Sequence, residues 1–237
     1  MRAADLAKEW GYKRLTLLEF GVAAGAGLLN ICRIAAEVTK VTGIEFRVVG
    51  FDTGTGMPEP IDYRDLPEAY AAGDFPMDAD RLRASLPPNC ELILGPITET
   101  LPEFLSTVDA SAPIGFASVD VDYYSSAKDS LAAFTGDPEK YLPLVPIYLD
   151  DIGDITVNPW VGEWLAVNEF NAENPMRKMA PWNMLRSRRI CKNAKWIEHI
   201  YGLHVHDHAL RTPGRQLRAR RTADNEFIGV SFETEAA

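Results

Sequence analysis

Short runs of β-branched and aromatic residues recur along the first two thirds of the chain, separated by stretches with helical spacing. Strands are predicted at 15–21, 46–52, 90–97, 114–120 and 144–149, and helices at 26–40, around 100–108, after 124 and around 159–174. Strand candidates that are apolar on both faces are typical of a buried parallel sheet. Strands that alternate with helices predict an α/β fold, with a doubly wound, mostly parallel, Rossmann-like sheet.

The end of the chain and one long insertion depart from this alternation. Two last strand candidates, 196–206 and 226–233, follow each other without a helix between them, which predicts an antiparallel edge strand. The segment at about 53–89 is rich in Pro, Gly and acidic residues, with helical fragments near 65–72 and 78–85. Long excursions in compact domains are usually lids or binding loops. We therefore predict a single domain, 1–237, with a lid insertion.

A glycine turn follows the first predicted strand. Gly21, Gly25 and Gly27 allow backbone angles and close ligand approach that a Cβ would obstruct, and the helix behind them offers free N–H donors. The second strand ends on Asp52, about 25–30 positions beyond the turn, as expected for a carboxylate that binds ribose. The spacing is GxxxGxG and not the dinucleotide fingerprint GxGxxG. The turn therefore predicts a nucleotide-type cofactor site of unspecified kind.

Two acidic clusters lie where two successive buried strands should end. Asp120 and Asp122 follow IGFASV, and Asp150 and Asp151 follow LVPIYL. Neighbouring parallel strands point their carboxyl ends into one crevice, so the four side chains should converge there. Converging carboxylates repel one another unless they are protonated, hydrogen-bonded or neutralised by a cation. Oxygen ligands of this kind suit Mg²⁺ or Ca²⁺, so we predict a metal site; the alternative is that each aspartate caps a helix or closes a turn.

The composition of the chain argues against some classes of binding partner. The net charge of −10 and the pI near 4.9 argue against a nucleic-acid binder, although a basic stretch lies between Arg186 and Arg221. The three cysteines are widely spaced, which favours a reduced, cytoplasmic compartment over a disulfide framework. No apolar run is long enough to span a membrane, and no leader is expected. A small-molecule partner is expected, and a homo-oligomer is left open.

Six strings occur in one order along residues 15–172: EFGVAAGAG, GFDTGTGMPEP, LILGPITETLPEF, FASVDVDYYSSAKDSL, IYLDD and AVNEF. Together they resemble the macrocin O-methyltransferase family, class I enzymes that use S-adenosylmethionine and a metal ion. The most specific strings are the second and the fourth. The segment 173–237 is less familiar.

The resemblance implies a role for each matching residue. Glu19, Gly21, Gly25 and Gly27 would line the methionine end of S-adenosylmethionine, and Asp52 would hold its ribose. Asp120, Asp150 and Asp151 would bind Mg²⁺, with Asp120 also accepting the proton of a substrate hydroxyl, and Asp122 would support them. The acceptor would be a hydroxyl of a small molecule such as a sugar, a diol or a catechol.

Two other interpretations use different residues. In a short-chain dehydrogenase that uses NAD(P), Tyr124 and Lys128 of YSSAK would form a Y-x-x-x-K pair, with the tyrosine as catalytic acid. That interpretation leaves the double aspartate without a role. The string HVHDH places His204, His206 and His208 on one face if the strand continues through it, which a zinc ion could use, but histidines at a strand edge or surface are the commoner case.

Overall fold

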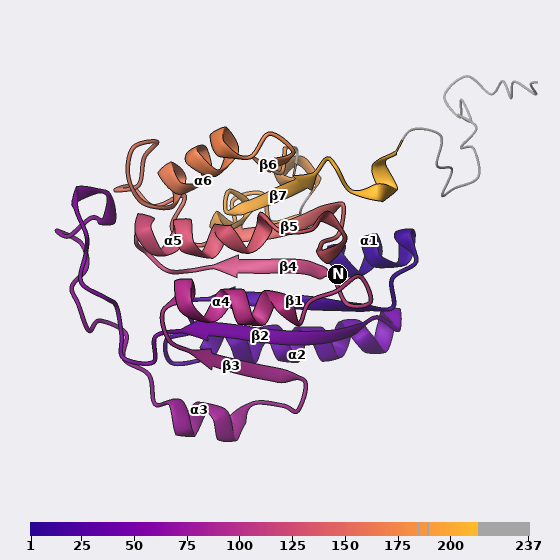
Figure 1. Cartoon of the computed structure of the whole chain (residues 1–237), viewed down its shortest axis with the longest axis horizontal. Coiled ribbons are helices and arrows are strands. Elements are labelled where there is room, and N and C mark those ends of the chain that lie inside the picture. The colour runs from indigo at the N-terminus through magenta and orange to yellow at the C-terminus, as the bar shows by residue number, and fades with distance from the viewer. Residues whose placement is uncertain (184, 189, 213–237) are drawn as a thin grey trace, which may run out of the picture.

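The computed structural model describes residues 1–183, 185–188 and 190–212 of the chain. Its centre is one seven-stranded sheet in the order β3-β2-β1-β4-β5-β7-β6 (Figure 1). The strands span Arg14–Phe20 (β1), Glu45–Asp52 (β2), Cys90–Leu94 (β3), Ile114–Val119 (β4), Leu144–Leu149 (β5), Arg177–Pro181 (β6) and Ile200–Val205 (β7). The first five run parallel, and β7 is antiparallel to both β5 and β6. The predicted α/β class, with a mostly parallel sheet and an antiparallel strand, is confirmed.

Within the described residues there are six α-helices, and five of them cover the two faces of this sheet. The six span Arg2–Trp10 (α1), Ala26–Thr42 (α2), Ala79–Ser85 (α3), Ile97–Ser106 (α4), Tyr124–Leu131 (α5) and Gly162–Glu173 (α6). Helix α3 lies beyond the β3 edge of the sheet (Figure 1). Helices α1 and α2 pack together on one face, while α4, α5 and α6 follow one another across the other (Figure 1). The sheet between them is apolar on both faces, as in β1, where every residue after Arg14 is buried. This double coverage is why the strands read as continuous hydrophobic runs.

The antiparallel edge is made differently from the prediction. The strand expected at 196–206 is shorter, Ile200–Val205, and a 3₁₀ turn at Lys195–Ile197 precedes it. Its outer partner is Arg177–Pro181, which the hydrophobic pattern did not predict, and the strand expected at 226–233 lies outside the described residues. The sequence RKMAP hides this strand because one of its two buried side chains is Arg177, which forms an ion pair with Asp207.

The long insertion is more firmly attached than a free lid. Met57 and Asp74 close its base through a backbone hydrogen bond of 2.8 Å. Asp65 is buried, and its carboxylate accepts hydrogen bonds from the backbone N–H of Ser125 (2.8 Å), the hydroxyl of Ser125 (3.1 Å) and the backbone N–H of Ile61 (2.8 Å). The insertion is thus fixed to the start of α5 by a side chain from within it.

Two local predictions are wrong, and one element was not predicted at all. The fragment at 65–72 is not a helix; the chain there forms a 3₁₀ turn, Tyr63–Asp65, and leaves it through Leu66 at φ 54°. The serines at the start of α5 are not its caps, because the N-cap is Tyr123 and Asp65 supplies the missing acceptor. The first residues do form an element, α1, whose buried Ala3, Leu6 and Ala7 follow helical spacing.

Candidate functional site

The carboxyl ends of the three central strands meet at one edge of the sheet. The backbone ladder continues one residue past each strand: Gly21 N–H donates to Phe51 O (2.9 Å), Asp120 N–H to Phe20 O (2.9 Å), and Asp150 N–H to Val119 O (3.0 Å). Gly21, Asp120 and Asp150 therefore lie side by side, as the order of strands required. This edge is where open α/β sheets bind ligands.

The glycine turn after β1 is shaped by close backbone approach. Gly21 has φ 81°, and a Cβ on it would lie 1.6 Å from the backbone oxygen of Asp120. Gly25 has φ 88° and is the N-cap of α2, and a Cβ on Gly27 would lie 2.1 Å from Oε1 of Glu19. Only glycine fits positions 21 and 27 without movement of their neighbours.

Asp52, at the end of β2, holds this turn in place. Its Oδ2 accepts the backbone N–H groups of Val22 and Ala23, each at 2.9 Å, and its Oδ1 accepts that of Gly54 at 2.7 Å. Ala23 itself has φ 46°. The carboxylate predicted to bind ribose thus fixes the conformation of the glycine turn, and Asp52 is half-buried and lines the cavity described below.

Glu19 is buried in β1 beneath the turn. Only 4% of its surface is exposed, and its Oε2 has no hydrogen-bond partner among the described residues. Burial, with smaller contributions from the charges of Asp120, Cys32 and Asp52, raises the pKa of Glu19 to about 8. A buried carboxyl oxygen without a donor is costly, which makes this atom a natural acceptor for a ligand.

The aspartates beyond β4 and β5 are close enough to perturb one another. Burial raises the pKa of Asp120 to about 7, with further contributions from the charges of Asp150 and Asp122. Burial also raises the pKa of Asp151 to about 8, with contributions from Asp122, Asp120 and Asp150. The buried Glu163 of α6 has a pKa well above its usual range, chiefly through desolvation and then through Asp151. The convergence of acidic residues expected from the strand ends is therefore present.

These aspartates make different contacts. Oδ1 of Asp150 accepts the hydroxyl of Tyr148 at 2.6 Å. Oδ2 of Asp151 accepts the backbone N–H of Asp122 at 3.1 Å, and the backbone N–H of Asp151 donates to Oε2 of Glu163 at 3.0 Å. Asp151 is thus engaged in holding two loops together. Within residues 1–183, 185–188 and 190–212, no group of three or more His, Cys, Asp or Glu side chains is arranged to hold a metal ion.

A cavity of about 460 Å³ joins the two halves of the site. Its size falls within the usual range of ligand pockets. From the predicted set, the residues that line it are Glu19, Gly21, Gly27, Asp52, Asp120 and Asp150, together with Asp122. Gly25 and Asp151 are not among the lining residues that the structure describes. The insertion contributes Met57, Pro58, Asp74 and Phe75, none of which the sequence singled out.

Donor chemistry decides whether Mg²⁺ fits this cavity. Mg²⁺ is usually held by one or two carboxylates, and waters and substrate oxygens complete its octahedron. Asp120 and Asp150 both line the cavity and follow adjacent strands, which matches that requirement. A ligand set of three aspartates that included Asp151 is not formed in the described structure. The pair fits a divalent cation, and the predicted trio is not preassembled.

The dehydrogenase arrangement is not found. The hydroxyl of Tyr124 donates to Glu169 at 2.7 Å, and Lys128 also pairs with Glu169 at 2.7 Å. The guanidinium of Arg64 lies 4.5 Å from the centroid of the Tyr124 ring. Burial raises the pKa of Tyr124, whereas a catalytic acid of that class needs a lowered one. Tyr124 and Lys128 therefore join α5, α6 and the insertion, and neither is among the described residues that line the cavity.

The three histidines do not share one strand face. Strand β7 ends at Val205, where His204 and His206 stack with centroids 5.8 Å apart. His208 is buried, and its Nδ1 accepts the backbone N–H of Leu210 at 3.0 Å. Burial, then the charges of Arg211 and His206, lowers the pKa of His204. The zinc interpretation fails because the chain turns after β7.

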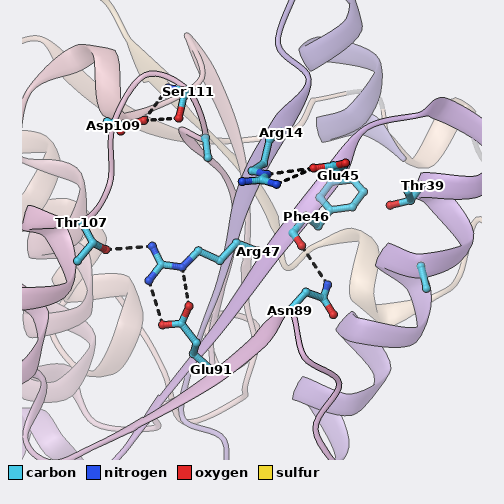
Figure 2. A pocket seen from close by; sticks show the side chains of 12 residues that line it. Arg14, Thr39, Glu45, Phe46, Arg47, Asn89, Glu91, Thr107, Asp109 and Ser111 are labelled. Atoms are coloured by element: carbon cyan, nitrogen blue, oxygen red, sulfur yellow. Dashed lines mark hydrogen bonds and ion pairs between the residues drawn. The ribbon is translucent and has the colours of Figure 1, made fainter.

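A second cavity, of about 670 Å³, lies at the opposite ends of the strands. Figure 2 shows that its charged groups are paired across it: Arg14 with Glu45 (2.7 Å), and Arg47 with both oxygens of Glu91 (2.8 and 2.9 Å). Nothing in the described part of this cavity presents the carboxylates or the glycine turn on which the chemistry depends. It is larger than the cavity at the glycine turn, but it is not the candidate reaction site.

Comparison with solved structures identifies proteins with a similar fold. The crystal structure of CalS11, a calicheamicin methyltransferase, matches 71% of this chain and 68% of that chain with a TM-score of 0.53 and 22% sequence identity. The structure of the O-methyltransferase NovP matches 73% of this chain and 69% of that chain with a TM-score of 0.53 and 17% identity. No protein-family model and no curated protein sequence matches the chain.

The sheet order agrees with these matches. A dinucleotide-binding Rossmann sheet has six parallel strands in the order 3-2-1-4-5-6. Here the seventh strand is inserted antiparallel beside β5, which gives 3-2-1-4-5-7-6. The chain has the class I methyltransferase fold.

No described helix combines the length and apolar character needed to cross a membrane.

Proposed function

We propose that the chain is an S-adenosylmethionine-dependent O-methyltransferase, assisted by Mg²⁺, that acts on a hydroxyl of a small molecule. The observation that carries this proposal is the single cavity into which the glycine turn, Asp52, Asp120 and Asp150 all open. The printed names of the two structural matches, a calicheamicin methyltransferase and an O-methyltransferase, support the same class of reaction.

Each side of the cavity suits one part of the cofactor. The N-terminus of α2, behind Gly25, offers free backbone N–H groups to the cofactor's carboxylate. Oε2 of Glu19, which lacks a partner among the described residues, would accept its ammonium. Asp52 would accept the ribose hydroxyls while its bonds to Val22 and Ala23 keep the turn fixed. The cofactor supplies a methyl group on a sulfonium, and this chain's residues orient it.

Asp120 is placed to act as the general base. Burial raises the pKa of Asp120, and its carboxylate would accept the proton that the acceptor hydroxyl releases. Asp120 and Asp150 would hold a divalent cation, which would supply Lewis-acid polarisation of the acceptor hydroxyl. Tyr148 holds the carboxylate of Asp150 in one orientation through its 2.6 Å hydrogen bond. Asp151 and Glu163 fix the loop that carries Asp150. Transfer also requires the acceptor hydroxyl to be positioned in line with the methyl group of the cofactor.

Calorimetry with S-adenosylmethionine, followed by a methyl-transfer assay on diols, catechols and sugars, tests this function. Saturable binding of the cofactor is expected, with transfer that chelators abolish. Asp150→Ala should remove transfer and leave the cofactor affinity within about twofold, since Asp150 is on the acceptor side. Asp80→Ala, on the exposed side of α3, is the matched control and should change neither quantity. Binding of NAD(P) in place of S-adenosylmethionine, or full activity of Asp150→Ala in chelator, contradicts the proposal.

A further inference from the structure

A histidine that is not among the described residues lining the cavity closes the end of β5. In an antiparallel ladder, two facing residues can exchange both of their N–H···O bonds. The backbone N–H of Leu149 donates to the backbone oxygen of His199 at 3.0 Å, but the backbone N–H of His199 donates to Trp196, in the 3₁₀ turn before β7 (3.2 Å). Nδ1 of His199 replaces it, 3.0 Å from the carbonyl oxygen of Leu149. Because a carbonyl oxygen only accepts, that ring nitrogen carries the proton.

The imidazole of His199 contacts both β5 and the loop that follows it. Its ring stacks on that of Tyr148, with centroids 5.7 Å apart and an angle of 18° between the planes. A Cβ added to Gly153 would lie 2.9 Å from Nε2, which is closer than a side chain normally allows. The loop after the two aspartates can therefore approach the ring because residue 153 is glycine. A hydrogen bond, an aromatic neighbour and a loop together fix the imidazole.

Tyr148 connects this ring to the acceptor side of the cavity. Its hydroxyl donates to Oδ1 of Asp150 at 2.6 Å, and Asp150 lines the cavity. That bond engages one oxygen of the carboxylate and restricts rotation of its plane. The hydroxyl keeps its place only while the tyrosine ring stays in one rotamer. The stack with His199 restricts that ring, so the orientation of Asp150 depends on His199 through Tyr148.

We propose that His199 is a positioning residue: it holds Tyr148, which in turn orients the carboxylate of Asp150 for binding of a divalent cation. The inference rests on the proposed metal-assisted methyl transfer and adds a residue to its machinery. Groups that orient a metal-binding side chain typically change metal affinity by about 10–100-fold when they are removed. Packing alone does not explain these residue types. Aliphatic side chains would also fill the end of β5, but they could donate neither to Asp150 nor to Leu149.

A double-mutant cycle on Mn²⁺ binding tests these linked contacts. The electron paramagnetic resonance signal of free Mn²⁺ gives the affinity of the full chain for the metal, with S-adenosylhomocysteine present and without turnover. Tyr148→Phe, which keeps the ring and removes the hydroxyl, and His199→Ala should each weaken Mn²⁺ binding about tenfold. The double variant should bind no more than about twofold more weakly than either single variant, because His199 acts through the Tyr148 hydroxyl. Independent effects would multiply to about a hundredfold.

His204→Ala is the matched control. His204 also stacks on a neighbouring ring, that of His206, with centroids 5.8 Å apart, but it pairs with Leu144 at the other end of β5. Its replacement should leave Mn²⁺ affinity unchanged. His199→Leu, which fills the space without a ring or a donor, should lose as much affinity as His199→Ala and serves if the alanine variant does not fold. Every variant should bind S-adenosylmethionine as the original chain does.

Mn²⁺ affinity that is undiminished in the His199 variants, equal losses in His204→Ala, or losses that multiply in the double variant overturn the inference. A loss in His199→Ala that is absent from Tyr148→Phe overturns it as well. Lower thermal stability of His199→Ala with unchanged Mn²⁺ affinity would show that the histidine only packs the end of β5, which also overturns it. If the original chain transfers methyl groups but binds no Mn²⁺, the inference fails while methyl transfer stands. Failure to bind S-adenosylmethionine defeats the proposed function itself.

Discussion

Replacement of Gly21 by alanine tests how the site is built at its tightest point. Gly21 has φ 81°, which costs an L-residue about 1–2 kcal/mol. The added Cβ would lie 1.6 Å from the backbone oxygen of Asp120 and 2.7 Å from its carbonyl carbon. Backbone atoms cannot rotate away as a side chain can, so β1 and the turn after β4 must separate. Overpacking of this kind adds about 1–3 kcal/mol, or more where the obstacle is rigid.

Gly43 provides the matched control. It also has a positive φ, 73°, at the end of α2, but an added Cβ there meets nothing within 4 Å. Gly43→Ala should therefore lose only the conformational contribution, about 1–2 kcal/mol. Gly21→Ala should lose about 2–5 kcal/mol from the two contributions combined. The difference isolates the close approach of the glycine turn to Asp120.

Urea unfolding followed by circular dichroism measures both variants. The expected result is a free energy of unfolding lowered at least about 1 kcal/mol further in Gly21→Ala than in Gly43→Ala. S-adenosylmethionine affinity should fall in Gly21→Ala and remain unchanged in Gly43→Ala, since Gly43 is at the far end of the helix. Equal losses of stability in the two variants would refute the steric reasoning and leave only the backbone angle as the reason for glycine at position 21.

Three further predictions concern the insertion, the rival mechanism and the titration of the site. Asp65→Ala should lower the free energy of unfolding by about 2–3 kcal/mol and expose the insertion to limited proteolysis, because buried N–H donors lose their acceptor; Asp62→Ala, which removes the half-exposed ion pair of Asp62 with Arg64, should cost under about 1 kcal/mol. Tyr124→Phe should keep the rate of methyl transfer within about threefold, whereas a dehydrogenase would be inactivated; the transfer assay decides. Glu19 and Asp151 have pKa values raised to about 8, so between their ordinary range near pH 4 and pH 8 the folded state binds more protons than the unfolded state. Stability should therefore fall as pH rises through that window, by at least about 1 kcal/mol between pH 6 and 8, and Mg²⁺ should reverse part of the loss. Thermal unfolding at the two pH values, with and without Mg²⁺, would contradict this if stability were unchanged or rose.

The structural features that could be predicted from the sequence are those that depend on consecutive residues. A buried parallel strand is a hydrophobic run, and the residue after it lies at the carboxyl edge of the sheet, so Gly21, Asp52, Asp120 and Asp150 could be assigned to one edge. That assignment uses only the position of each residue after a strand and no contact with a ligand. The doubly wound, mostly parallel character of the sheet then followed from the alternation of strands and helices.

The features that sequence missed depend on partners far along the chain. Asp65 caps α5 across 60 positions, which no local cap pattern reveals, and the serines beside it looked like the caps instead. Strand β6 is held by its register with β7 and by a buried arginine, against the hydrophobic pattern. Asp151 shares the sequence pattern of Asp150, but its carboxylate accepts a backbone N–H of the Asp122 turn. The local sequence shows that a residue lies at the carboxyl edge of the sheet. Tertiary contacts decide whether its side chain lines the cavity or binds a neighbouring loop.

The acidic lining of this cavity is difficult to explain as a device for stability. Burial raises the pKa values of Glu19, Asp120 and Asp151, which means that each ionised form is destabilised by the fold around it. Apolar or amide side chains of similar size would remove that destabilisation without loss of packing. The N–H donors that do contact the cluster, such as that of Asp122, satisfy single oxygens and leave the net charge uncompensated. The repulsion within this set of carboxylates is relieved either by protonation or by positive charge from outside the chain, and a sulfonium cofactor and a divalent cation are two sources that one methyl-transfer site can bring together.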